Sequence, residues 1–95
     1  MANIYYNRQY IDSKDKQAVM KALNEDLITG GKNVRDFELK LKKNLNVKFA
    51  KSCINGTAAL HIVCLTLGLK PGDEVIVPAI TFAASSNCVL YTGAK

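Results

Sequence analysis

The sequence has few of the residues on which disulfide-rich domains and metalloproteins depend. Its 95 residues include three cysteines, one histidine and two prolines. Cys53, Cys64 and Cys88 are an odd number without metal-ligand spacing, and each has apolar neighbours, so we interpret them as buried thiols. His61 has no second histidine or carboxylate at ligand spacing, which favours a packed histidine over a metal ligand. We therefore expect neither a disulfide framework nor a bound metal.

Two common phosphate-binding motifs are also missing. The dinucleotide fingerprint GxGxxG does not occur. The pair Gly31-Lys32 is not part of a Walker A loop, because that motif needs glycine where Asp26 stands and serine or threonine where Asn33 stands. Any phosphate site must therefore be of another kind.

No segment has the character of a signal peptide or a membrane span. The N-terminal stretch MANIYYNRQYIDSKDK lacks an apolar run after a basic start. Two uncharged runs, residues 52–69 and 75–94, approach spanning length, but both contain polar residues and Pro78 interrupts the second. We interpret them as buried core segments, and expect a cytoplasmic protein without membrane contact.

The net charge of +5 is confined to one segment. Residues 32–51 carry seven basic and two acidic side chains, whereas the rest of the chain carries six of each. Such a segment can attract the phosphate of a nucleic acid, a nucleotide or a cofactor, or it can be a solvated helix face. We favour the solvated face and expect no nucleic-acid partner.

Hydrophobic periodicity predicts helices alternating with short strands. Helices are expected over residues 13–24, 33–45, 58–67 and 81–90. The second should turn its apolar positions inward, namely Val34, Phe37, Leu41 and Leu45. Strands are expected over residues 49–53 and 75–77, with the approach to another at 93–95. This alternation implies parallel strands with crossover helices, so the predicted class is α/β, with too few strands for a covered sheet.

The strongest local signal is the predicted strand–turn–helix around Asn55, Gly56 and Thr57. Free amides of a first helical turn and the positive end of the helix dipole attract anions, and a glycine lets a phosphate approach closely. Asn55 and Thr57 are equally suited to plain helix capping, so both interpretations stand. Phe82 follows the next predicted strand and offers a flat ring for a flat ligand, or else packs in the core.

Together these segments resemble the DegT/DnrJ family of sugar aminotransferases, which are pyridoxal-phosphate enzymes of fold type I. The likeness covers nearly the whole chain, through the Tyr6 segment, Asp12-Ser13-Lys14-Asp15, ITGGKNVRDFELKL, NGTAAL and GDEVIVPAITFAASSNCVLYTGA. It implies an incomplete N-terminal part of the large α/β domain. Residues 1–31 would form the N-terminal helix and substrate segment, and residues 32–95 the start of the domain that binds pyridoxal 5′-phosphate.

The resemblance also implies roles for individual residues. The cofactor phosphate would be held by Gly56, Thr57 and Ala58, with Phe82 stacked on the pyridine ring. A nucleotide-sugar substrate would be lined by Tyr6, Asp26, Leu27, Ile28 and Thr29. Family members are homodimers whose sites use both subunits, so the N-terminal segment would serve its neighbour.

The family's catalytic groups have no counterpart in this sequence. The lysine that attaches the cofactor and the aspartate that pairs with its ring nitrogen lie downstream of these motifs, whereas Lys95 is the only charged residue after Phe82. The complete enzyme would transfer an amino group, with glutamate as donor, to a UDP-4-keto-6-deoxy amino sugar of the pseudaminic acid type. The chain alone is expected to be inactive. The alternative is a non-catalytic remnant that binds the cofactor or nucleotide sugar, or a partner of an intact aminotransferase.

Overall fold

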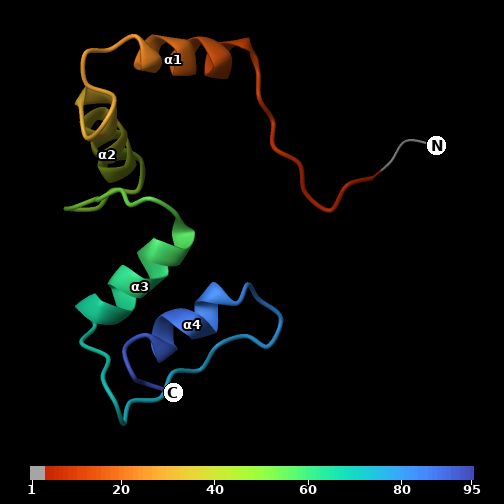
Figure 1. Cartoon of the computed structure of the whole chain (residues 1–95), viewed down its shortest axis with the longest axis vertical. Coiled ribbons are helices and arrows are strands. Elements are labelled where there is room, and N and C mark those ends of the chain that lie inside the picture. Colours follow the sequence, from red (N-terminus) through yellow and green to blue (C-terminus); the bar gives the residue numbers. More distant parts are fainter. Residues whose placement is uncertain (1–3) are drawn as a thin grey trace. The chain divides into compact units, whose positions relative to one another are not determined.

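The computed structural model describes residues 4–95, so Met1, Ala2 and Asn3 of the predicted N-terminal segment lie outside the described residues. Within these described residues, four helices follow one another along the chain (Figure 1). They are α1 (Ser13–Leu23), α2 (Lys32–Asn44), α3 (Gly56–Thr66) and α4 (Ala84–Leu90). The chain divides into two compact units, Met1–Ala50 with α1 and α2, and Lys51–Lys95 with α3 and α4.

The start of α1 is fixed by a reciprocal capping box. The Asp12 carboxylate accepts hydrogen bonds from the amides of Lys14 and Asp15 at 2.7 and 3.0 Å, and the Asp15 carboxylate accepts one from the Asp12 amide at 2.9 Å. These bonds satisfy amides that a helix start otherwise leaves unpaired. The predicted first helix is therefore confirmed to within one residue.

Helix α2 forms where it was predicted, but its apolar face is not covered within its own unit. Val34, Phe37 and Leu45 are exposed, and Leu41 is half-buried. No described residue of the first unit is buried. The prediction that these side chains turn into a core is therefore wrong for this unit, because helical periodicity identifies an apolar face and not what packs against it.

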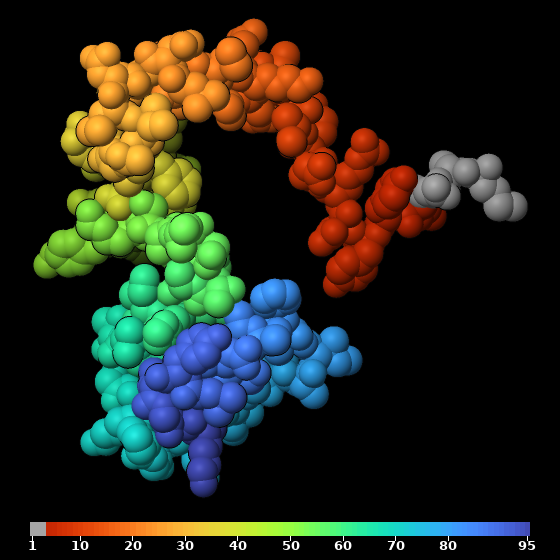
Figure 2. All heavy atoms as spheres, in the orientation of Figure 1, coloured from red at the N-terminus to blue at the C-terminus, as the bar shows by residue number. Residues whose placement is uncertain are grey.

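The second unit has a small core between α3 and α4, which touch in the space-filling view (Figure 2). Its buried members are Cys64, Cys88, Val89 and Ala94, with Leu69 and Val75 packed against them. An edge-to-face contact of His61 and Tyr91, with ring centroids 5.2 Å apart, adds to it. Both predicted helices are confirmed, although α4 begins three residues later than expected.

The prediction of three buried thiols is correct for two of them. Cys64 and Cys88 are buried, but Cys53 is exposed and donates a weak hydrogen bond to the carbonyl of Asn55 at 3.3 Å. Cys53 lies where a buried strand was expected, so its exposure follows from the missing strand.

The predicted strands are wrong for this structure, because none of residues 4–95 is in a β-strand. A strand exists only where a second backbone pairs with it, and such pairing is nearly absent here. Two bonds do occur: the Lys95 amide donates to the Asp73 carbonyl at 2.9 Å, and the Val75 amide donates to the Lys95 carbonyl at 2.7 Å. Together they form the pattern of a single parallel rung between Glu74 and Lys95.

Candidate functional site

The turn before α3 is partly closed by its own cap. The Asn55 side-chain oxygen accepts a hydrogen bond from the Ala58 amide at 2.8 Å, so the capping interpretation of Asn55 is confirmed. The amides of Gly56 and Thr57 make no hydrogen bond within the part of the chain that the structure describes. Of the three residues predicted to hold the cofactor phosphate, Gly56 and Thr57 therefore keep a free backbone amide, whereas the Ala58 amide is already bonded to Asn55.

The space in front of this turn is open. A methyl group placed on Gly56 would meet no atom within 4 Å, and Gly56 is exposed. Thr57 and Ala58 are half-buried beneath it. Free amides, an open approach and the positive end of the α3 dipole together make an arrangement that can bind an anion.

Phe82 lies in the turn that leads into α4, in the same unit as Gly56. The residue is 76% exposed, so the core-packing interpretation is wrong in this structure. The turn is held by a hydrogen bond between the hydroxyls of Thr81 and Ser85 at 2.9 Å, and by one from the Ser85 amide to the Phe82 carbonyl at 2.9 Å. An exposed ring on a fixed turn can stack against a planar ligand.

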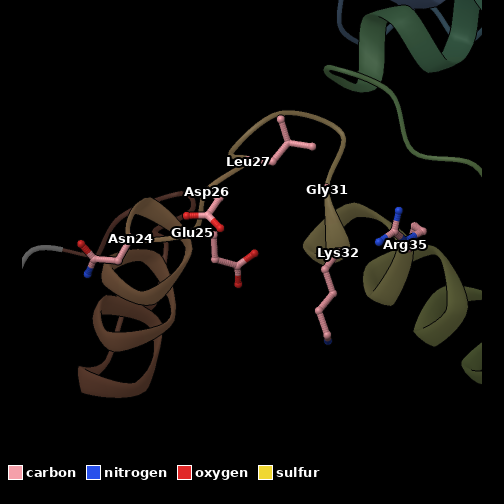
Figure 3. Close-up of a pocket in the computed structure, with 7 residues that line it drawn as sticks. All are labelled: Asn24, Glu25, Asp26, Leu27, Gly31, Lys32 and Arg35. Carbon is pink, nitrogen blue, oxygen red and sulfur yellow. The ribbon is translucent and has the colours of Figure 1, made fainter.

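A pocket lies in the first unit, between the end of α1 and the start of α2 (Figure 3). It has a volume of about 410 Å³, within the usual range for small-ligand pockets. Carboxylates come from the segment after α1 and basic groups from α2 (Figure 3). Its lining residues are Asn24, Glu25, Asp26, Leu27, Gly31, Lys32 and Arg35.

The two basic groups of this pocket differ in availability. The Lys32 ammonium pairs with the Asp36 carboxylate one turn along α2, which raises the pKa of Lys32 and lowers the pKa of Asp36. Arg35 has no ion pair among the described residues. Its guanidinium is therefore the pocket's available donor for a phosphate or carboxylate.

The structure brings only part of the predicted substrate segment to this pocket. Asp26 and Leu27 line it, whereas Ile28 and Thr29 are exposed in the same turn and do not. Tyr6 is fully exposed in the segment before α1 and does not reach it. The charge pattern placed Lys32 and Arg35 in a basic segment, but it did not identify them as pocket residues.

Residues 4–95 contain no cluster of three or more histidine, cysteine or carboxylate side chains that could hold a metal ion. No helix over the same residues is long and apolar enough to cross a membrane.

Comparison with known proteins gives one family. The profile of the DegT/DnrJ/EryC1/StrS aminotransferase family matches residues 9–95. A GDP-perosamine synthase of Escherichia coli O157:H7 is 41% identical over 85 residues, covering 88% of this chain and 23% of the relative. A UDP-4-amino-4,6-dideoxy-N-acetyl-beta-L-altrosamine transaminase of Campylobacter jejuni is 41% identical over 92 residues, covering 97% and 24%.

A third relative has a different sugar in its name. The UDP-2-acetamido-2-deoxy-3-oxo-D-glucuronate aminotransferase of Pseudomonas aeruginosa is 36% identical over 96 residues, which cover 92% of this chain and 27% of that protein. The chain thus spans about a quarter of the length of the curated relatives that it matches.

Proposed function

Because the chain belongs to the DegT/DnrJ/EryC1/StrS aminotransferase family, we propose that it supplies the cofactor-phosphate and substrate-binding part of a nucleotide-sugar aminotransferase. The enzyme would use pyridoxal 5′-phosphate and transfer an amino group from glutamate to a nucleotide-linked keto-sugar. The three relatives described above bear names of enzymes that act on sugars, which supports the general reaction. Among the similar proteins, the altrosamine transaminases favour a UDP-4-keto-6-deoxy amino sugar as acceptor.

The observation that carries the cofactor proposal is the open turn at Gly56. In this proposal the free amides of Gly56 and Thr57 and the Thr57 hydroxyl bind the phosphate, with the α3 dipole opposing its charge. Phe82 stacks on the ring, and Asn55 holds the Ala58 amide in place at 2.8 Å. When bound, pyridoxal phosphate supplies the electron sink for amino-group transfer.

The substrate proposal depends on the pocket between α1 and α2. The Arg35 guanidinium has no ion pair among the described residues and is suited to a nucleotide diphosphate. Asp26 can accept hydrogen bonds from sugar or ribose hydroxyls beside it. Tyr6 does not line this pocket, which fits a role for the N-terminal segment at the site of a second subunit in a homodimer.

In this proposal, amino-group transfer needs catalytic residues that are not among the 95 residues of the chain. No lysine of the chain matches the family position that attaches the cofactor, so the 95 residues alone should show no transamination. We place the protein in the cytoplasm, with residues 1–31 as its substrate segment and residues 32–95 as the beginning of an α/β fold type I domain. The α/β class follows here from the family, since the described residues form no strand.

Binding of 4-deoxypyridoxine 5′-phosphate tests the cofactor site directly. This compound keeps the ring and phosphate but lacks the aldehyde, so it cannot react with surface lysines. We expect Gly56→Ala to weaken binding by about tenfold, or about 1.4 kcal/mol, because the added methyl occupies the phosphate approach. Helix content should not change, since the methyl meets no protein atom within 4 Å.

The matched ligand control is 4-deoxypyridoxine without its phosphate, whose weaker binding should be insensitive to Gly56→Ala. Equal binding of the two compounds, or equal affinity of the variant and the natural sequence, would contradict the phosphate cradle. For the substrate pocket, Arg35→Gln should weaken binding of UDP in calorimetry, whereas Lys40→Gln on the same helix should not.

A further inference from the structure

Two buried thiols lie against each other where α3 packs on α4. Cys64 and Cys88 are 24 positions apart in sequence, yet their sulfur atoms are 3.6 Å apart. Their exposed fractions are 7% and 3%, and both belong to the core of the second unit. Neither residue belongs to the proposed cofactor or substrate site, so this pair is unexplained by the proposed function.

We propose that Cys64 and Cys88 form a reversible oxidation site, at which a small peroxide converts the two thiols into a disulfide linking α3 to α4. The proposal depends on the closeness of the two sulfur atoms and on their shared burial, and is independent of the aminotransferase activity. Because the pair lies in a protein core, the expected oxidant is a diffusible molecule of the size of hydrogen peroxide.

The hydrogen bonds indicate which sulfur reacts first. The Cys64 thiol donates to the Cys88 sulfur, and the Cys88 thiol donates to the Ser85 carbonyl at 3.3 Å. If Cys88 loses its proton, its thiolate keeps the hydrogen bond from Cys64. Burial and the neighbouring sulfur raise the pKa of the Cys64 thiol, which makes Cys64 the poorer nucleophile. Cys88 is therefore the attacking residue and Cys64 the resolving one.

The two steps balance in atoms and electrons. The Cys88 sulfur attacks one oxygen of hydrogen peroxide, the O–O bond breaks, and the released hydroxide takes the thiol proton as the first water. The Cys64 sulfur then attacks the Cys88 sulfur, the S–OH bond breaks, and the hydroxide leaves with the Cys64 proton as the second water. Two thiols are oxidised by two electrons, and one peroxide is reduced to two waters.

Bond formation needs only a small movement. The sulfur atoms must approach from 3.6 Å to the usual S–S length of about 2.05 Å. Helix α4 has only seven residues and packs on α3, so a side-chain rotation and a slight shift can supply this approach. In a reducing compartment the bond would be transient.

The test uses the 95-residue chain with Cys53→Ser, which removes the exposed thiol. After reduction, removal of the reductant and exposure to hydrogen peroxide, intact mass should fall by two hydrogens, and peptide mapping should join the Cys64 and Cys88 peptides. Dithiothreitol should restore the original mass. A chain with unchanged helix content by circular dichroism and no joined peptide would overturn the proposal.

Two further variants test the order of reaction. With Cys64→Ser, the first step should still occur and dimedone should label Cys88 as its sulfenic acid. With Cys88→Ser, labelling of Cys64 should be lower than that of Cys88 in the first variant, because burial still raises the pKa of the Cys64 thiol. Equal labelling of the two variants would overturn the assigned order of reaction. Over-oxidation to sulfinic acid without any disulfide would overturn the proposed oxidation site.

Discussion

At the scale of single residues, Asn55 caps the N-terminus of α3, a role that the sequence alone could not assign. An asparagine before a predicted helix is suited both to capping and to a ligand turn, because the same side-chain oxygen can serve either purpose. The structure assigns it to the Ala58 amide and leaves the amides of Gly56 and Thr57 free. Composition and spacing identify such a residue, but only the hydrogen-bond partner assigns its task.

Removing the Asn55 cap should destabilise α3. We expect Asn55→Ala to lower the free energy of unfolding of the second unit by about 1 kcal/mol, because the Ala58 amide loses its acceptor. Urea denaturation followed by circular dichroism at 222 nm measures this loss. Asn55→Ser keeps a capping oxygen and is the matched control, so equal losses for alanine and serine would contradict the role of the cap.

The buried Cys64 thiol should make stability depend on pH in the alkaline range. Burial raises its pKa above the ordinary value of 9.0, so the unfolded chain ionises first as the pH rises. The contribution is fully present below pH 9.0, and the free energy of unfolding should fall as the pH rises above that value. Denaturation curves of the natural sequence and of Cys64→Ala measure the difference, which should shrink with rising pH; a constant difference would contradict the assignment.

At the scale of elements, helices were predictable and strands were not. A helix satisfies its own backbone, so apolar spacing was enough to locate the four described helices to within a few residues. A strand depends on a partner elsewhere in the chain. The β-branched run Val75-Ile76-Val77 finds one rung, between Glu74 and Lys95, and therefore stays extended without forming a ladder.

The same reasoning explains how much of the candidate site was predictable. Gly56 and Thr57 were identified from a local pattern, since a turn and the helix after it are contiguous in sequence. The pocket residues Arg35 and Lys32 were not, because a pocket depends on how α1 and α2 are joined across the intervening turn.

The turn after α4 should tolerate a side chain at Gly93 poorly. Gly93 has φ of +81°, and a methyl there would lie 2.8 Å from Cγ of Pro71. Gly68, with φ of +73° and nothing within 4 Å, is the matched control. Gly68→Ala should cost about 1 kcal/mol for the left-handed backbone, and Gly93→Ala clearly more because the clash adds to it.

Thermal and urea denaturation of the two glycine variants measure that difference. Equal losses in the free energy of unfolding would show that Pro71 moves aside without cost, and would contradict a role for this contact in fixing glycine at position 93.

At the scale of the whole molecule, exposed apolar side chains are the dominant feature. Ile76 and Ile80 are 100% and 98% exposed; Ile76 lies in an extended segment with few backbone partners and Ile80 in the bend that follows it. Family membership and the helices could be inferred from sequence, but this degree of exposure could not, because periodicity does not reveal whether a face finds a partner.

The extended segment around Ile76 should drive self-association. An exposed extended segment with β-branched side chains and unpaired backbone donors and acceptors is a template for pairing with other chains. We expect Ile76→Lys combined with Ile80→Lys to lower the weight-average mass in sedimentation experiments at high protein concentration. Ile54→Lys, at a site that is 90% exposed outside this segment, is the control. An equal effect of the control would assign association to hydrophobicity in general.

The extended segment beside the single rung between Glu74 and Lys95 has one covered face and one uncovered face. Along the extended backbone beside it, Val75 and Val77 are half-buried and Ile76 between them is fully exposed. Alternate side chains of an extended chain point to opposite faces, and Val75 packs on the α3–α4 core. One face of this extended segment is therefore already covered by α3 and α4. Ile76 lies on the opposite, uncovered face, where an α/β fold would place a second layer of helices.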